Sequence, residues 1–208
     1  MTLQLGAYAG LDFGNLGLEA YAGGGFNDFE SSRRIEVGDF NAEADGDWQG
    51  VHYNASLRGG YDIDVGDRFW IRPAFSIDYL SLTEDAYTET GDTGIALDVA
   101  KRTSDLGGAT AMLNLGAKFQ GKRTWIRPAL RFGYRNEFIN DGVLTDFGFN
   151  GLTSRSIIES EIFPKEGFLV GFSIGAGSAY SSFGLDVDSD IRDGLIRHTG
   201  RVVLRLIF

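Results

Sequence analysis

Apolar and polar side chains alternate through most of this chain. Within Val51–Val65, odd-numbered positions are apolar or glycine, and even-numbered positions are polar apart from Gly60. The same two-residue period recurs over Ile71–Tyr79, Ala109–Phe119 and Phe168–Ile174. Because successive side chains of a strand point to opposite faces, each segment predicts a strand with one apolar and one polar face. Each apolar band has about nine to eleven residues, which is the length of a tilted strand that crosses a bilayer.

Short and long connections alternate between these predicted strands. The short turns lie at 13–15, 65–68, 120–123 and 177–181. The longer polar stretches, which we expect to be loops, lie at 28–47, 83–92, 140–165 and 192–198. Short periplasmic turns that alternate with longer outer loops are typical of outer-membrane barrels. The sequence therefore predicts an all-β fold, a transmembrane antiparallel meander β-barrel of the outer-membrane type.

The pattern predicts about nine strands. They are expected at 2–13, 15–27, 47–65, 68–84, 94–120, 122–139, 166–177, 180–191 and 196–208. Single-chain bacterial barrels normally have an even number of strands, with both chain ends in the periplasm. We therefore expect at least one further strand before Met1.

Composition narrows the class of protein. Thirty glycines against three prolines suit tight turns and a crowded barrel wall, and the lack of cysteine excludes disulfides and thiolate chemistry. A net charge of −10 argues against a nucleic-acid partner, which requires a basic surface. No apolar run approaches the roughly 18 to 20 residues that a membrane-spanning helix requires, so if the chain crosses a membrane it must do so with strands. The start at Met1 lacks the basic and apolar regions of a secretory signal.

The last strand has the clearest two-faced pattern. Its apolar face ends on an aromatic residue at the carboxyl terminus, while Arg201 and Arg205 lie on the opposite face. The apolar positions are Val202, Leu204, Leu206 and Phe208.

A five-residue motif occurs twice. Trp70–Ala74 and Trp125–Ala129 both read Trp-Ile-Arg-Pro-Ala, and each copy follows a short turn. Proline cannot donate to a strand ladder, so it belongs near strand ends, where water satisfies the orphaned carbonyl. The two copies therefore predict equivalent strands that run in the same direction through one wall.

Taken in order, these motifs resemble the translocator domain of autotransporters, which belong to type V secretion. The resemblance rests on Leu5–Tyr8, Ser32–Ile35, Gly60–Asp62, the repeated Trp-Ile-Arg-Pro-Ala motif and the closing strand, and it covers nearly the whole chain. It implies a twelve-stranded barrel in the Gram-negative outer membrane, which anchors an amino-terminal passenger and helps to export it to the cell surface.

The resemblance also implies a domain organisation and a set of partners. Residues 1–208 correspond to a partial autotransporter β-barrel domain that lacks about the first three strands, the linker helix and the passenger. Three more strands restore an even count. The expected partners are outer-membrane lipid, the barrel-insertion machinery and the chain's own passenger segment, and no cofactor is expected. The closing-strand residues are expected to act as a C-terminal assembly signal, plausibly by adding an edge strand to the insertion machinery.

Charged side chains on the polar faces are candidates for the barrel lumen. Placed there, they avoid the roughly 2–4 kcal/mol cost of Lys or Arg at the lipid midplane, and they can pair across the pore. They form either a solvated, salt-bridged interior or a polar conduit for the passenger. The expected lumen-facing residues are Arg58, Arg72, Asp78, Arg127, Arg131, Arg135, Glu137, Asp186, Asp188, Arg201 and Arg205, with Asp62 and Asp190 on the same parity.

Other candidate chemistry has less support. Asp186, Asp188 and Asp190 fit alternation on one strand face better than a calcium loop, which requires Gly and Glu where the chain has Ile191 and Arg197. No nucleophile-elbow motif accompanies either of the two histidines, His52 and His198, so we expect no catalytic or metal-binding residue. The acidic stretch at 28–47 is expected to be a solvated surface loop.

Three alternative functions remain open at this point. A general porin-like channel has a similar wall but no upstream passenger. A soluble β-sandwich or lipocalin-like module refolds in plain buffer, whereas a membrane barrel aggregates without detergent. An outer-membrane enzyme depends on one of the histidines.

Overall fold

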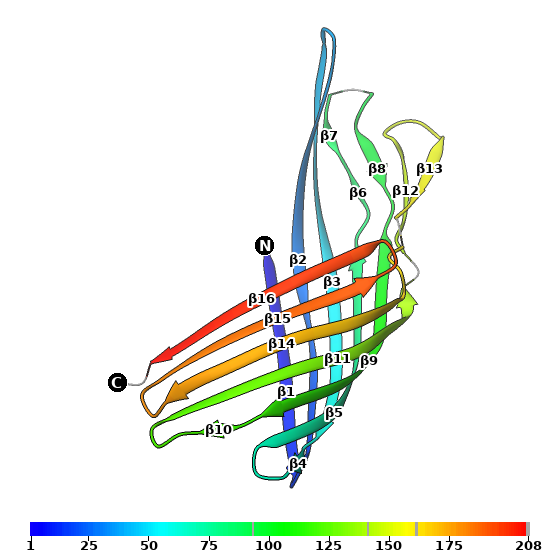
Figure 1. Cartoon of the computed structure of the whole chain (residues 1–208). Helices are drawn as coiled ribbons and strands as arrows, with labels where there is room; N and C mark the ends of the chain where they lie inside the picture. Colours follow the sequence, from blue (N-terminus) through cyan, green and yellow to red (C-terminus); the bar gives the residue numbers. More distant parts are fainter. Residues whose placement is uncertain (93, 141, 161, 207–208) are drawn as a thin grey trace.

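One curved antiparallel sheet makes up most of the molecule (Figure 1). The computed structural model describes residues 1–92, 94–140, 142–160 and 162–206. Among them, no helix is long and apolar enough to cross a membrane. The sheet curls into a half-barrel, which confirms the expected all-β barrel-type fold. Its principal strands, in sheet order, are β1 (Thr2–Phe13), β2 (Leu16–Val37), β3 (Phe40–Tyr61), β5 (Phe69–Glu84), β9 (Arg102–Ala117), β11 (Thr124–Asn140), β14 (Glu166–Ser178), β15 (Ser181–Arg192) and β16 (Leu195–Leu206).

Strand pairing assigns each side chain to the convex or the concave face. Neighbours in the sheet pair in register, so Leu57 lies opposite Ile77, and Ile71 lies opposite Leu115. Large apolar side chains such as Tyr53 and Phe75 are exposed on the convex face, which is the face that contacts lipid in an outer-membrane barrel. The part of the principal sheet that carries this apolar convex face is called the membrane wall below, and its other face is the concave face.

Both copies of the Trp-Ile-Arg-Pro-Ala motif interrupt the sheet at the same point. Pairing between β3 and β5 stops at Gly60 and resumes where β4 (Ile63–Val65) pairs with β5. Pairing between β9 and β11 stops at Gly116 and resumes at β10 (Phe119–Gln120). The missing donor of Pro73 or Pro128 lies within each interruption. The two strands are therefore equivalent, as the repeat predicts.

The stretch at 28–47 is not a loop, contrary to the sequence-based expectation. β2 and β3 continue as a hairpin, in which Asp28 pairs with Gln49 and Val37 with Phe40, and the chain turns at Gly38 with φ of 59°. Dense charge of this kind is typical of a loop. Strands beyond the membrane satisfy their backbone groups by pairing with each other, however, and do not need an apolar face for lipid. Figure 1 shows this hairpin projecting beyond the rest of the sheet.

A second, smaller sheet lies beside the hairpin, in stretches expected to be loops except for Leu97–Val99, which lies within the strand expected at 94–120. That single strand is wrong, because Leu97–Val99 pairs in the smaller sheet and only Arg102–Ala117 pairs in the principal sheet. Residues 28–49, 84–92, 94–102 and 142–160 together are called the outward extension below. The strands of the smaller sheet, in sheet order, are β13 (Arg155–Glu159), β12 (Leu144–Phe149), β8 (Leu97–Val99) and β6 (Tyr87–Thr88). The short strand β7 (Thr90–Gly91) pairs with β3 of the hairpin.

The apolar core lies in the outward extension. Ala42, Ala44 and Ile95 form a buried cluster, against which Ile35 packs. The buried polar side chains of the membrane wall are Thr110, Glu137 and Asp190. The buried polar side chains of the wall therefore gather on the concave face of the sheet.

Candidate functional site: the charged concave face

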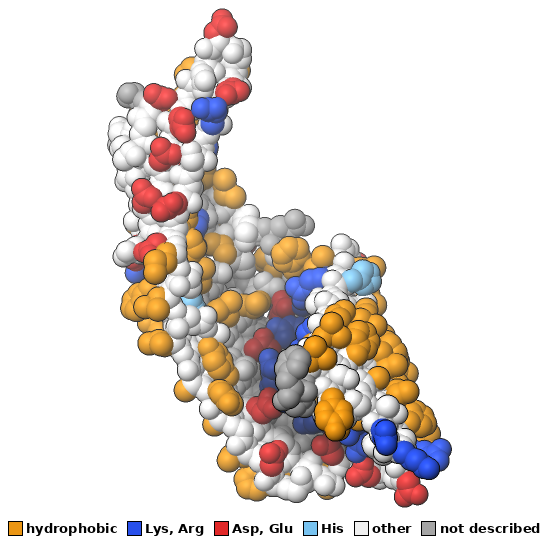
Figure 2. Space-filling view, turned by 90° about the vertical axis from the view of Figure 1, so that its left-hand side faces the viewer, with side chains coloured by type: hydrophobic (Ala, Val, Ile, Leu, Met, Phe, Trp, Pro, Cys, Tyr) orange, Lys and Arg blue, Asp and Glu red, His pale blue; other side chains and the backbone are white. Residues whose placement is uncertain are grey.

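Ionisable side chains follow the hollow of the curved sheet (Figure 2). In the same view, apolar side chains cover the outer flank, and acidic side chains predominate on the projecting part. Several of the expected lumen residues line one concave cavity of about 580 Å³. They are Arg58, Arg72, Asp78 and Arg135, and Glu19 of β2 joins them.

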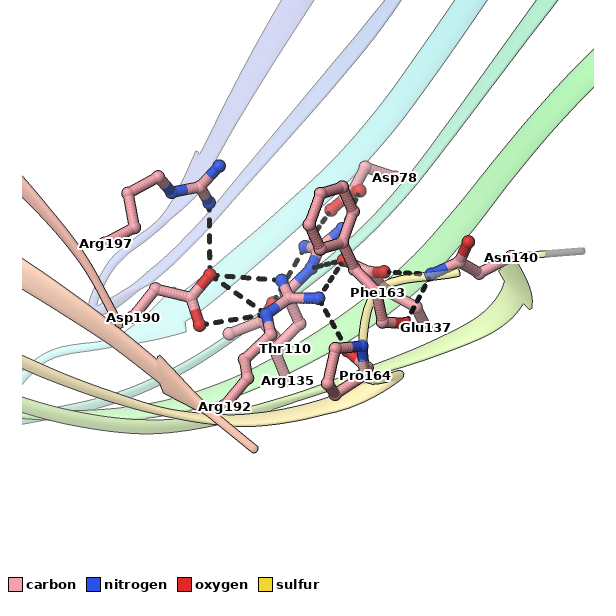
Figure 3. A network of polar contacts seen from close by, with 10 residues as sticks. All are labelled: Asp78, Thr110, Arg135, Glu137, Asn140, Phe163, Pro164, Asp190, Arg192 and Arg197. Atoms are coloured by element: carbon pink, nitrogen blue, oxygen red, sulfur yellow. Dashed lines mark hydrogen bonds and ion pairs between the residues drawn. The ribbon is translucent and has the colours of Figure 1, made fainter. Parts of the chain in front are cut away.

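A network of ion pairs connects β5, β11 and β15 across this face (Figure 3). Arg135 donates two hydrogen bonds to the Asp78 carboxylate, at 2.7 and 3.0 Å, and its Nε lies 3.1 Å from Glu137 Oε1. The other side of Glu137 meets Arg192, whose Nη1 lies 2.8 Å from the same Oε1. Arg192 also binds Asp190, with Nη2 to Oδ2 at 3.1 Å.

The centre of this network is withdrawn from solvent. The side chains of Arg192, Glu137 and Asp190 are 6%, 7% and 8% exposed. Buried charges are tolerated when they are paired and hydrogen-bonded, and these three satisfy one another. Asn140 completes the shell of Glu137 with a hydrogen bond of 2.8 Å to Oε2. The network therefore holds charged groups in fixed positions on the concave face of the wall, at the end of β11 and β15 near the outward extension.

A second cluster lies on β11, β15 and β16. Arg131 donates to Asp188 at 2.9 Å and to Asp186 at 3.2 Å, and Arg201 reaches Asp186 from the edge strand at 3.1 Å. Gly171 makes room for this cluster, because a Cβ there would lie 2.1 Å from Asp188 Oδ1 and 2.8 Å from Arg131 Nε.

The remaining expected residues have different surroundings. Arg127 lies over the ring of Trp125, with its guanidinium carbon 5.0 Å from the ring centroid. Arg72 approaches Asp62 at 3.8 Å. Within the described part of the chain, Arg58, Arg127 and Arg205 form no ion pair.

The sequence did not predict the roles of Arg192, which is buried in the network, or of Arg197, which is exposed and binds Asp190. Arg192 lies in the loop expected at 192–198, and Arg197 lies where that loop overlaps the strand expected at 196–208, whereas β15 extends to Arg192 and β16 begins at Leu195. The alternation of Asp186, Asp188 and Asp190 continues to Arg192, and this signal could have placed it on the concave face. The contact of Arg192 Nη1 with the Pro164 carbonyl at 3.0 Å could not have been found in the same way, because it joins segments distant in the chain.

A stacked group of rings lies where the wall meets the outward extension. Trp48 stacks between Phe29 and Tyr87, with centroid distances of 5.3 and 4.3 Å. Its Nε1 donates to Glu84 at 2.9 Å, and Glu84 accepts two hydrogen bonds from Arg102. Hydrogen bonding to Arg102 lowers the pKa of Glu84, and burial raises the pKa of Tyr87. These stacked rings and the Glu84–Arg102 ion pair hold β2, β3, β5, β6 and β9 together where the outward extension begins.

The residues considered for catalysis and metal binding have other partners. Asp186 and Asp188 bind Arg131, and Asp190 binds Arg192 and Arg197. His52 shares a hydrogen bond of 2.9 Å with Asn27, and His198 shares one of 2.9 Å with Ser189. The described residues contain no cluster of three or more His, Cys, Asp or Glu side chains that could hold a metal ion.

The closing strand β16 forms one edge of the sheet. Val202 pairs with Leu185, Leu204 with Phe183, and Leu206 with Ser181, so its apolar side chains share the convex face with those of β15. Among the described residues β16 pairs only with β15, and its other edge is open. Phe208, the last residue of the expected signal, lies outside the described residues.

Comparison with known proteins agrees with this geometry. The family model described as "Autotransporter beta-domain" matches residues 1–192. No curated protein matches the chain. Since the match covers most of the sequence, the chain belongs to the autotransporter beta-domain family. It is an outer-membrane β-barrel of type V secretion, and this is a family of translocator barrels rather than of catalysts.

Proposed function

We propose that this autotransporter barrel domain anchors an amino-terminal passenger in the outer membrane and helps to export it to the cell surface. The observation that carries the proposal is the charged concave face, which lies opposite an apolar convex face along the whole membrane wall. An extended polypeptide that passes along such a face exchanges hydrogen bonds with water and with fixed charges instead of meeting lipid. The family match supports the translocator role.

The open edges of the sheet support a larger barrel. Among the described residues, β1 pairs only with β2, and β16 pairs only with β15. An unpaired strand edge is unfavourable in a bilayer, because its backbone groups find no hydrogen-bonding partner there. In this proposal residues 1–208 form part of a twelve-stranded barrel, and about three further strands with a linker helix and a passenger come from an adjoining segment.

Surface display of a tagged passenger tests the export role. The full gene carries an epitope tag in its passenger region, and antibody binding to intact cells is compared with total tag in lysed cells. We expect binding on intact cells, and its loss when residues 1–208 are deleted while synthesis of the tagged segment continues. A tag confined to the periplasm beside an intact barrel contradicts export. A gene with no passenger region favours the porin-like channel.

The closing strand is proposed as the assembly signal. Its open edge and the convex apolar side chains Val202, Leu204 and Leu206 suit strand addition to the barrel-insertion machinery. Deleting Phe208 from the full gene is expected to lower the amount of barrel in the outer membrane without changing synthesis. Arg205→Gln serves as the control, because it alters the opposite face of the same strand. Unchanged outer-membrane levels after deletion of Phe208 contradict the signal role.

A further inference from the structure

An apolar hollow of about 380 Å³ lies in the membrane wall near the short turns. Strand register explains its shape. Ile71, Leu115, Leu130 and Phe172 pair side by side across β5, β9, β11 and β14, and they form a row of large convex side chains. In the next row toward the turns, Phe69 pairs with the small Ala117.

Pro128 deepens the hollow beside Ala117. The ladder between β9 and β11 is interrupted here, since pairing stops at Gly116 opposite Ala129 and resumes at Phe119 opposite Ile126. From the concave side, the ring of Trp70 lies against Gly116, where a Cβ would come within 2.3 Å of the ring. At Gly116 the floor of the hollow is therefore only the backbone of the sheet, and the indole of Trp70 lies on the other, concave side of that backbone.

The first copy of the repeated motif has a large side chain at the position that Ala117 occupies beside the second copy. There, Tyr61 occupies the ladder position opposite Pro73 that Ala117 occupies opposite Pro128, because register continues unchanged across both interruptions. One copy thus has a large side chain at this position, and the other has a methyl group beside an open space.

Basic side chains gather at the turns next to the hollow. Arg68 precedes Phe69, and Lys122 and Arg123 form the turn between β10 and β11. All three are exposed, and none forms an ion pair with a described residue. The turns after β1 and β14, at 14–15 and 179–180, carry no charged residue. Arg68 follows Asp67 in its own turn, whereas Lys122 and Arg123 are adjacent cations with no acidic residue in their turn, in a chain with a net charge of −10.

We propose that this hollow is a binding site for an anionic glycerophospholipid of the periplasmic leaflet, with an acyl chain in the hollow and the phosphate beside Lys122 and Arg123. Five residues of extended strand separate Pro128 from Arg123, about 17 Å along the strand. One leaflet contributes about half of the roughly 30 Å hydrocarbon core, so the distal part of an acyl chain reaches the hollow while its phosphate stays at the turn. Basic side chains at membrane interfaces recognise anionic headgroups in this way.

Quenching of Trp70 by brominated lipids tests the proposal. The parent protein, with Trp48→Phe and Trp125→Phe to leave Trp70 as the reporter, is reconstituted in phosphatidylcholine vesicles. These contain phosphatidylglycerol or phosphatidylcholine brominated on the acyl chains, at equal mole fractions. We expect stronger quenching by the brominated phosphatidylglycerol, corresponding to a preference of about fivefold for each of the two basic side chains beside the phosphate.

Two variants separate the acyl contact from the headgroup contact. Ala117→Tyr, which copies the residue of the first motif, is expected to abolish the preference by filling the hollow. Ala111→Tyr, on the convex face of the same strand, is the matched control and should keep the preference. Lys122→Gln with Arg123→Gln should leave quenching by brominated phosphatidylcholine unchanged and remove the additional quenching by phosphatidylglycerol.

Three results would overturn the proposal. The first is equal quenching by both brominated lipids in the protein without further substitutions. The second is an unchanged preference for phosphatidylglycerol in Ala117→Tyr. The third is that the protein self-associates and Ala117→Tyr does not, which would place a second copy of the chain in the hollow. The inference goes beyond the proposed export function, because lipid binding is measured without a passenger and holds whether or not one is exported.

Discussion

The membrane wall and the outward extension use the same antiparallel pairing, but they bury different side chains. In the extension, the buried apolar residues are Ala42, Ala44, Ile95, Ala96 and Val99. Among the described residues of the wall, Ala117 is the buried apolar residue, and the buried polar residues Thr110, Glu137 and Asp190 lie on the concave face. The wall therefore buries mainly polar side chains, whereas the extension buries mainly apolar ones.

The difference shows that the surrounding solvent decides which side chains a sheet buries. Lipid covers the convex face of the wall, so large apolar side chains on that face are already removed from water. The concave face therefore does not have to bury apolar side chains and can carry charged ones. Water surrounds the extension, so its sheets must bury apolar surface between them as soluble proteins do. Substitutions that suit one region should therefore harm the other.

The largest effect is expected from Arg192→Leu, which removes a buried charge from the wall. Glu137 and Asp190 then lose a partner in a site of low exposure, at a cost of about 3 kcal/mol in the free energy of unfolding. Urea unfolding in lipid vesicles measures the loss. Arg197→Leu is the matched control: Arg197 binds the same Asp190 but is 67% exposed, so its removal should cost at most about 1 kcal/mol. Equal losses would contradict a buried network.

Leu115→Arg is expected to destabilise the wall by about 2–4 kcal/mol, because it places a cation on the lipid-facing side. Asn114→Arg, one residue away on the concave face, should have little effect in the same unfolding experiment. A spin label at each position offers an independent measurement, and the label at residue 115 should be more deeply embedded in the bilayer. Equal embedding of the two labels would contradict the assignment of the faces.

Ala44→Leu tests the core of the extension. Ala44 is fully buried, and added methyl groups in a packed core typically cost about 1–3 kcal/mol. We expect faster proteolysis of the extension with the wall still protected by lipid. Asn41→Leu, at an exposed position of the same strand, is the control and should cleave at the parent rate. Faster cleavage of the wall as well would show that the two regions unfold together.

Acid should weaken the base of the extension by a smaller amount. Hydrogen bonding to Arg102 lowers the pKa of Glu84 below its ordinary value of 4.5, so the stabilisation is complete above that pH and declines as pH falls through the lowered pKa. Fluorescence of Trp48, which donates to Glu84, reports the change when Trp70 and Trp125 are replaced by phenylalanine. Glu84→Gln should remove this pH dependence, and a response that persists in Glu84→Gln would assign it to another group.

Much of the fold could be predicted from the sequence, because lipid imposes a strict two-residue period. Tyr53, Ile77 and Leu115 have the predicted lipid-facing parity, and the nine principal strands occur in the expected order. The paired motif also predicts equivalent strands, since the missing donor of proline acts locally. The prediction failed at 28–47, where no lipid imposes a pattern and a charged hairpin looks like a loop.

The sequence by itself determined which face of each strand is apolar, where the short turns fall and that strands rather than helices cross the membrane. Only the tertiary structure decided which charges meet. Arg135 joins Asp78 across 57 residues, and Arg192 at the end of β15 donates to the carbonyl of Pro164 in the segment before β14. The reason is physical: alternation is set by the local geometry of one strand, whereas ion pairs and the hollow beside Ala117 depend on register between strands that are distant in the chain.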